Sequence, residues 1–204
     1  MQNPENQIEK VRKEINDHFN PETFVKGENT IVESPCKKYS LKTCEYYEDK
    51  EDSHWRLTKV EIFENSSGEK LFNFFGNDDR FFFEWLYKEQ TDYFFCAEDL
   101  FGGQTVIDLT NRKMTGYSPD EDGFISADIH LSPDGKLLVI IGCYWACPYI
   151  IKVFDFSEPL SLPLKELAEI ELIDNTELIK EWVDNTTIKT DQRIIDLNSF
   201  LGHE

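Results

Sequence analysis

The sequence predicts an all-β fold of about four repeated antiparallel β-meander units that follow an N-terminal amphipathic helix. Three observations lead to this prediction. Apolar residues recur with a helical period near the N-terminus and in short strand-like runs after it. Similar strand-and-turn segments then recur along the chain. Aromatic residues reach 14% of the 204 residues, and aromatic side chains pack well on strands.

The first expected element is a helix over residues 4–19. One apolar stripe runs along it at spacings of three, four and four: Ile8, Val11, Ile15 and Phe19. Asn3 can cap this helix, Pro4 suits its first position, and the pair Asn20-Pro21 ends it. We expect the helix to pack on the β-body, and docking into the groove of a partner is the alternative.

The rest of the chain has the pattern of short strands separated by polar turns. In the first half we expect strands over 30–32, 38–47, 55–64, 70–75, 82–88, 92–98 and 104–109. In the second half we expect strands over 125–131, 136–142, 149–156, 164–172, 179–183, 187–190 and 193–197. A helical turn over 174–181 is an alternative interpretation of one segment.

An internal repeat marks the units. Four segments share an apolar strand, an acid near its end and a polar turn, and the acids are Glu64, Asp108, Asp155 and Asp196. Their spacings of 44, 47 and 41 residues, with four strands per unit, are typical of propeller blades. We expect these acids to hydrogen-bond the backbone of their turns. The expected organisation is a helix in 1–20 and one domain over 21–204, with units 34–80, 81–118, 124–172 and 173–204.

The third unit carries a family resemblance. The run Ser132-Pro133-Asp134-Gly135-Lys136 leads into an apolar strand, and Val153-Phe154-Asp155 follows after a loop. This pattern resembles blades of WD40-like β-propellers, with Asp155 in place of the aspartate of their Trp-Asp pair and Phe154 in the Trp position. The resemblance is clearest over 124–156, and the usual Gly-His pair is missing. It implies a propeller-like architecture rather than a particular activity.

The fourth unit ends shortly after its third strand, which leaves an unpaired edge. We expect residues 22–33 to pair with this C-terminal unit, or the N-terminal helix to cover its edge. An open arc of blades and a dimer that completes the ring are the alternatives, so both a monomer and a dimer are compatible with the sequence.

Charge narrows the range of partners. Acidic residues outnumber basic ones 40 to 21, which gives a formal net charge of -19. Such a surface repels nucleic-acid backbones and anionic membranes, so neither is an expected partner. A basic protein partner, a cation and simple solubility remain compatible with this charge.

The sequence also bears on the compartment. The chain has no apolar run long enough for a membrane span and no signal-peptide pattern. Its five cysteines suggest reduced thiols in the cytoplasm.

One candidate binding surface follows from the blade pattern. The loops between the second and third strands of each unit, and the connections between units, should emerge on one face and combine aromatic side chains with carboxylates. The candidate binding residues are Tyr46, Tyr47, His54, Trp55, Asp99, Phe101, Tyr144 and Trp145. In the alternative interpretation these aromatic residues fold inward as core and the acids are simply hydrated.

Catalytic and metal motifs are weak. The sequence has no Gly-x-Ser-x-Gly elbow and no phosphate loop, and His54 beside Asp52 is the histidine worth testing. Cys143 and Cys147 lack a second ligand pair for zinc, and 120–123 lacks the spacing of a calcium loop. We therefore expect no catalytic residues, no metal and no cofactor.

The favoured function is a non-catalytic protein-binding module that presents an acidic, aromatic loop face. Two alternatives remain open. One is a hydrolase that uses carboxylates or a histidine in the central funnel. The other is an acidic inhibitor or immunity-type protein that blocks a basic partner.

Overall fold

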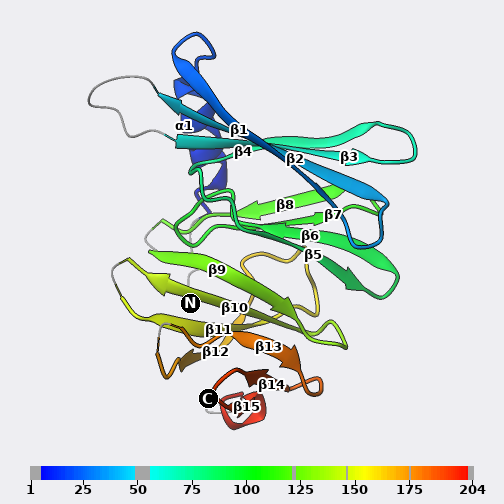
Figure 1. Ribbon diagram of the computed structural model, residues 1–204, viewed down its shortest axis with the longest axis vertical. Coiled ribbons are helices and arrows are strands. Elements are labelled where there is room, and N and C mark those ends of the chain that lie inside the picture. The colour runs from blue at the N-terminus through cyan, green and yellow to red at the C-terminus, as the bar shows by residue number, and fades with distance from the viewer. Residues whose placement is uncertain (1–5, 49–55, 121–122, 146, 175, 202–204) are drawn as a thin grey trace.

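The computed structural model describes residues 6–48, 56–120, 123–145, 147–174 and 176–201. These residues form an α-helix, four antiparallel sheets and a short 3-10 helix near the C-terminus (Figure 1). Each sheet is a meander in which consecutive strands are neighbours: β1–β4, β5–β8, β9–β12 and β13–β15. The chain therefore has the all-β, propeller-like architecture that the repeat predicts, and its last sheet has three strands.

The helix α1 spans Ile8–His18. The first two sheets contain β1 (Phe24–Glu33), β2 (Tyr39–Glu48), β3 (Arg56–Glu64), β4 (Lys70–Gly76), β5 (Phe83–Lys88), β6 (Thr91–Cys96), β7 (Gln104–Asp108) and β8 (Lys113–Tyr117). The last two contain β9 (Phe124–Leu131), β10 (Leu137–Tyr144), β11 (Tyr149–Asp155), β12 (Glu166–Glu171), β13 (Ile179–Trp182), β14 (Thr187–Thr190) and β15 (Ile194–Asp196).

The sheets stack face to face along the long axis of the molecule, and apolar side chains fill each interface (Figure 1). Central strands face a core on both sides, so neighbouring residues along one strand serve different cores. Phe94 packs between the first and second sheets, whereas Phe95 packs between the second and third. In the same way, Leu138 packs between the second and third sheets, and Val139 packs between the third and fourth. Because both faces are buried, these strands are continuously apolar instead of alternating.

The helix packs against the first sheet and also reaches the second. Its apolar stripe contacts Phe24 and Leu57 through Ile15, with Val11 and Phe19 beside them. At the other end, a Cβ added at Gly116 would lie only 2.8 Å from Arg12 Nη2 and 3.0 Å from Ile8 Cγ1. A glycine at this position of β8 therefore allows the close approach of the helix.

The helix boundaries differ from the prediction. The helix begins at Ile8, and Asn6 Oδ1 accepts a hydrogen bond from Ile8 N at 3.0 Å. The predicted caps, Asn3 and Pro4, lie outside the described residues. The helix ends at His18, because Phe19 is already in an extended conformation.

The expected pairing of the N-terminal strand was wrong, and one strand was missed. The strand expected over 30–32 is the end of a longer strand, β1, which pairs along its length with β2. It therefore completes the first sheet and does not pair with the C-terminal unit, and α1 does not cover that unit either. The sequence pattern also missed β8, while the helical turn considered for 174–181 gives way to strand β13 from Ile179 onward.

The stack is an open arc within the described residues, since the first and last sheets lie at opposite ends of the molecule (Figure 1). Both outer faces carry ion pairs. Glu61 of β3 lies 2.9 Å from Lys70 and 3.8 Å from Lys42, and Lys189 of β14 lies 2.8 Å from Glu181 of β13. On the last sheet the charges lie beside an exposed apolar residue, since Ile194 of β15 is the register partner of Lys189 and is 66% exposed. Charged outer faces on terminal repeats help stacked repeat proteins to end their cores.

Candidate functional site

Several loops gather at one end of the sheets, which we call the loop face. It is formed by the connections 77–82 and 118–120 and by the β6–β7 loop 97–103 (Figure 1). Trp145, which follows β10, lies against Phe101 of that loop. Hydrogen bonds join these segments: Asn77 N donates to Glu98 O at 2.9 Å, and Ser118 Oγ donates to Asp99 Oδ2 at 2.5 Å. Gly102 N of the same loop donates to Phe124 O at the start of β9 at 2.8 Å. The β2–β3 loop, with the candidates His54 and Trp55, lies outside the described residues.

The loop face brings together two of the candidate residues, Phe101 and Trp145. Their ring centroids are 6.4 Å apart in an edge-to-face arrangement with an interplanar angle of 65°. Phe101 is 39% exposed and Trp145 is 68% exposed. The two rings come from neighbouring sheets, so together they form an exposed aromatic pair across the junction between the second and third sheets.

Asp99 lies in the same loop as Phe101 and is itself buried. Its Oδ1 accepts from Asn77 Nδ2 at 2.7 Å and from Phe101 N at 3.2 Å, and its Oδ2 accepts from Ser118 Oγ at 2.5 Å. A Cβ added at Gly103 would lie 2.4 Å from Asp99 O, so the loop needs a glycine there. These contacts hold the loop that carries Phe101 against the connections at Asn77 and Ser118.

The tyrosine candidates lie elsewhere. Tyr46 packs inward against Phe19, which directly follows the helix, with ring centroids 5.1 Å apart. Tyr47, on the opposite side of β2, is exposed. Tyr144 is half-buried and packs edge-to-face on Phe124 at 5.6 Å. The alternative interpretation, inward-facing aromatic residues, therefore describes Tyr46 and part of Tyr144.

The described acids of the loop face are largely paired. Glu98 forms an ion pair with Arg12 of the helix, with Arg12 Nη2 2.7 Å from Glu98 Oε1. Asp78 accepts from Arg80 Nε at 3.2 Å, and Asp79 forms an ion pair with Arg56. These carboxylates thus already have cationic partners inside the chain, which counting charges along the sequence does not show.

The four repeat acids lie at the opposite ends of the strands, in the turns. Asp108 Oδ1 accepts from Asn111 N at 2.7 Å, Asp155 Oδ1 from Ser157 N at 2.8 Å, and Asp196 Oδ1 from Asn198 N at 3.0 Å. Glu64 instead accepts from the side-chain hydroxyl of Ser67 at 2.6 Å. The hydrogen bonds from Ser157 lower the pKa of Asp155.

A buried lysine near the loop face was missed by the sequence reasoning. Lys152 Nζ lies 4.7 Å from the centre of the Phe124 ring, 5.0 Å from that of Tyr144, and 3.0 Å from Glu166 Oε2. Burial alone would lower the pKa of Lys152, but the hydrogen bonds to Tyr144 and Glu166 outweigh it and the pKa is raised. The available signal was a single charge inside the apolar strand 149–155.

The groups relevant to catalysis are sparse. His130 Nε2 lies 2.7 Å from Asp128 Oδ2 on β9, and burial raises the pKa of the nearby Glu84 on β5. Within the described ranges, no set of three histidine, cysteine or acidic side chains could hold a metal ion.

All five cysteines, Cys143 and Cys147 among them, are free thiols. None of the helical structure described here is long and apolar enough to cross a bilayer.

Comparison with known proteins gives limited likenesses. No protein-family model matches the chain. The uncharacterized protein R762 of Acanthamoeba polyphaga mimivirus is 26% identical over 147 residues, which cover 71% of this chain and 57% of the viral protein. The chain therefore spans little more than half the length of that relative.

Two solved structures are also similar. The β-propeller domain of Cps50 (Swd1) from Myceliophteria thermophila matches with a TM-score of 0.43 and 10% identity, over 84% of this chain and 71% of that one. The dihydro-heme d1 dehydrogenase NirN, in complex with DHE, matches with a TM-score of 0.28 and 12% identity, over 84% of this chain and 40% of that one.

Proposed function

We propose that this chain is a non-catalytic protein-binding module, and that the exposed pair Phe101 and Trp145 is the centre of its binding surface. The observation that carries the proposal is the edge-to-face contact of these two rings across two sheets. Large aromatic side chains dominate protein interfaces because they bury a rigid apolar area at low entropic cost. The buried Asp99 network holds the loop of Phe101 in place, which lowers the entropic cost of binding.

The partner in this proposal is a protein with a basic surface. The net charge of -19 would speed its approach over long range. Of the described acids on the loop face, Glu98, Asp78 and Asp79 have cationic partners and Asp99 is buried among neutral hydrogen-bond donors, so direct contact would depend mainly on the aromatic rings. The interaction should therefore weaken only moderately with salt.

The free cysteines support a reducing compartment, and the proposal places the protein in the cytoplasm.

The test is a pull-down with the double variant Phe101→Ala/Trp145→Ala, followed by affinity measurement with the purified partner. The matched control is Phe200→Ala, because Phe200 is also 39% exposed but lies at the C-terminal end. We expect the affinity of the double variant for the partner to fall about a hundredfold, and the affinity of the control to stay unchanged. Equal recovery by the folded double variant would refute this binding surface.

Each of two alternative functions predicts a different result, one in the salt dependence of binding and the other in substrate turnover. An acidic inhibitor of a basic protein would lose most of its affinity between low and high salt and would hardly respond to the aromatic substitutions. A hydrolase would depend on the Glu84, Asp128 and His130 group, so His130→Ala would abolish turnover of a substrate while leaving protein binding intact.

A further inference from the structure

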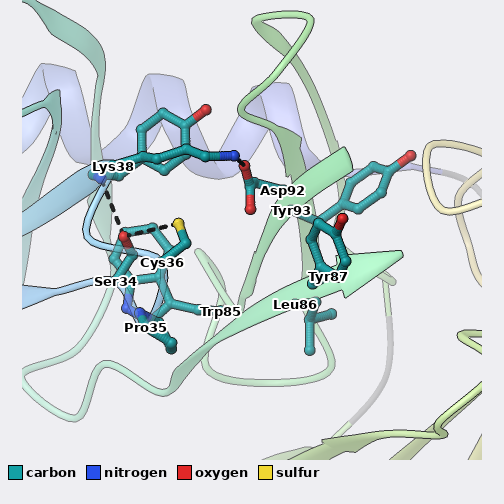
Figure 2. Close-up of a pocket in the computed structure, with 10 residues that line it drawn as sticks. Ser34, Pro35, Cys36, Lys38, Trp85, Leu86, Tyr87, Asp92 and Tyr93 are labelled. Carbon is teal, nitrogen blue, oxygen red and sulfur yellow. Dashed lines mark hydrogen bonds and ion pairs between the residues drawn. The ribbon is translucent and has the colours of Figure 1, made fainter. Parts of the chain in front are cut away.

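A separate pocket lies at the other end of the sheets from the loop face. It has a volume of about 400 Å³ and lies between the β1–β2 turn, residues 34–38, and strands β5 and β6 of the second sheet (Figure 2). A pocket of this size is in the range that binds small molecules. Because two different sheets form its walls, its shape depends on the packing of the stack.

Its walls are mainly apolar and aromatic. They include Pro35, Tyr39, Trp85, Leu86, Tyr87 and Tyr93. Figure 2 shows the turn and Trp85 on one side of the space and the rings of Tyr87 and Tyr93 on the other. Flat, apolar walls of this kind favour a flat apolar ligand, because offset and edge-to-face contacts add to the area buried.

One ion pair supplies the charged groups of the pocket lining. Lys38 Nζ lies 2.7 Å from Asp92 Oδ2, and this pair spans the top of the pocket in Figure 2. The Asp92 side chain is only 8% exposed, whereas that of Lys38 is 58% exposed. The two charges cancel, so a charged ligand would enter without an opposite charge to meet it. The ammonium still has further protons to donate, and the carboxylate has further lone pairs to accept with.

The turn that forms one wall is held in place. Ser34 Oγ accepts from Tyr39 N at 3.1 Å, and Lys37 N donates to Ser34 O at 2.8 Å. Tyr39 and Leu86 are buried, so they are fixed by the cores behind them. The pocket is therefore formed before any ligand binds, which reduces the entropic cost of binding.

We propose that this pocket binds a small, uncharged aromatic molecule that carries a carboxamide or a similar group. The ring would lie between Trp85 and Tyr87. The carbonyl oxygen would accept from Lys38, and the amide N–H would donate to Asp92. This site is independent of the proposed protein-binding surface on the loop face.

The test uses benzamide as the probe, with benzoate and benzylamine as charged analogues of the same size. Titration of the isotope-labelled protein, followed by the Trp85 indole resonance, should show saturable binding of benzamide. Both charged analogues should bind at least about tenfold more weakly, because each adds an uncompensated charge. Charged analogues that bind as tightly as benzamide would overturn the assigned ligand class.

Two substitutions locate the site. Tyr87→Ala should weaken benzamide binding about fivefold, because Tyr87 is a pocket wall but is 63% exposed and contributes little to the core. Lys38→Met should reverse the preference toward benzylamine, since it leaves the Asp92 carboxylate without its cation. The controls Phe200→Ala and Phe101→Ala/Trp145→Ala should leave benzamide binding unchanged, so failure of the protein-binding proposal would not affect this one.

Chemical protection gives an independent readout. Cys36 is an exposed thiol in the pocket wall, and Figure 2 shows its sulfur beside Ser34. Benzamide should slow the alkylation of Cys36 by iodoacetamide, while the exposed Cys147 should react at its usual rate. Absence of saturable benzamide binding overturns the proposal, and so does binding that neither responds to Tyr87→Ala nor protects Cys36.

Discussion

Arg12 of the helix holds the buried carboxylate of Glu98 with two hydrogen bonds. Arg12 Nε lies 2.9 Å from Glu98 Oε2, and Arg12 Nη2 lies 2.7 Å from Oε1. The Glu98 side chain is 1% exposed and also accepts from Thr105 Oγ1 at 2.7 Å. Hydrogen bonding to Glu98 raises the pKa of Arg12. This pair attaches the N-terminal helix to the β6–β7 loop that carries Asp99 and Phe101.

Removal of the arginine should destabilise the fold strongly. Arg12→Ala leaves the Glu98 carboxylate buried without its cation, so we expect the free energy of unfolding to fall by about 3 kcal/mol. Urea unfolding followed by circular dichroism measures this change. The matched control is Lys13→Ala on the same helix, whose ion pair with Asp17 is exposed, and it should leave stability unchanged. Equal effects of the two substitutions would contradict the role of the pair.

Glu177 should make stability depend on pH. Burial alone would raise its pKa, but hydrogen bonds from Ile173 N, Thr190 Oγ1 and Arg193 outweigh it and lower the pKa below the ordinary 4.5. An acid with a lowered folded pKa stabilises the fold above its unfolded pKa, and this contribution disappears as the pH falls toward the folded pKa. Glu177→Gln should therefore be less stable than the natural protein at about pH 7, with the difference shrinking below about pH 4.5.

Unfolding curves in urea between about pH 7 and pH 3 check this sign. Glu181→Gln is the control in the same sheet, because its ion pair with Lys189 is exposed. A difference between Glu177→Gln and the natural protein that grows as the pH falls would refute the expected linkage.

The turn acids should contribute to stability without affecting binding. Asp155→Ala removes the acceptor for Ser157 N, and we expect a loss of about 1 kcal/mol. Asp155→Asn keeps a side-chain oxygen at the same place and should recover most of that loss. Thermal unfolding measures both variants. A loss of partner binding in a stable Asp155→Ala protein would instead assign this turn to the interface.

The open arc should exist as a single chain in solution. Both terminal sheets present ion pairs outward, Glu61 with Lys70 at one end and Lys189 with Glu181 at the other. Docking of a second copy there would bury these charges, which is costly. Sedimentation equilibrium at micromolar concentration should therefore give the mass of one chain. A stable dimer that dissociates when Lys189 is replaced in the variant Lys189→Glu would instead support a dimer that completes the ring of sheets.

Strands with strong apolar patterns were recognisable from sequence, whereas weakly patterned ones were not. Strand β14 has the predicted bounds, 187–190, because three of its four residues are β-branched. Strand β8 (Lys113–Tyr117) carries a glycine and two polar residues, and β1 contains Gly27, Glu28 and Asn29. Both of these are strands because a strong neighbour pairs with them, and such pairing overrides the local preference.

The candidate site, like the strands, could be predicted only in part from the sequence. Sequence reasoning could name Phe101 and Trp145 as loop aromatics, since each lies between predicted strands. It could not show that the two rings meet, that Asp99 is buried and bonded to Asn77 and Ser118, or that Arg12 neutralises Glu98. Each of these facts joins residues from separate segments, as does the pocket between the 34–38 turn and Tyr87.

The sequence by itself determined the all-β class and the repeated meander, because hydrophobic period and turn residues are local properties. Tertiary structure alone decided that β1 completes the first sheet, that the arc stays open, and which side chains share a surface. Those outcomes depend on the free energy of contacts between segments far apart in the chain. Local pattern shows which side chains should be buried, but the packing of the sheets decides what each one is buried against.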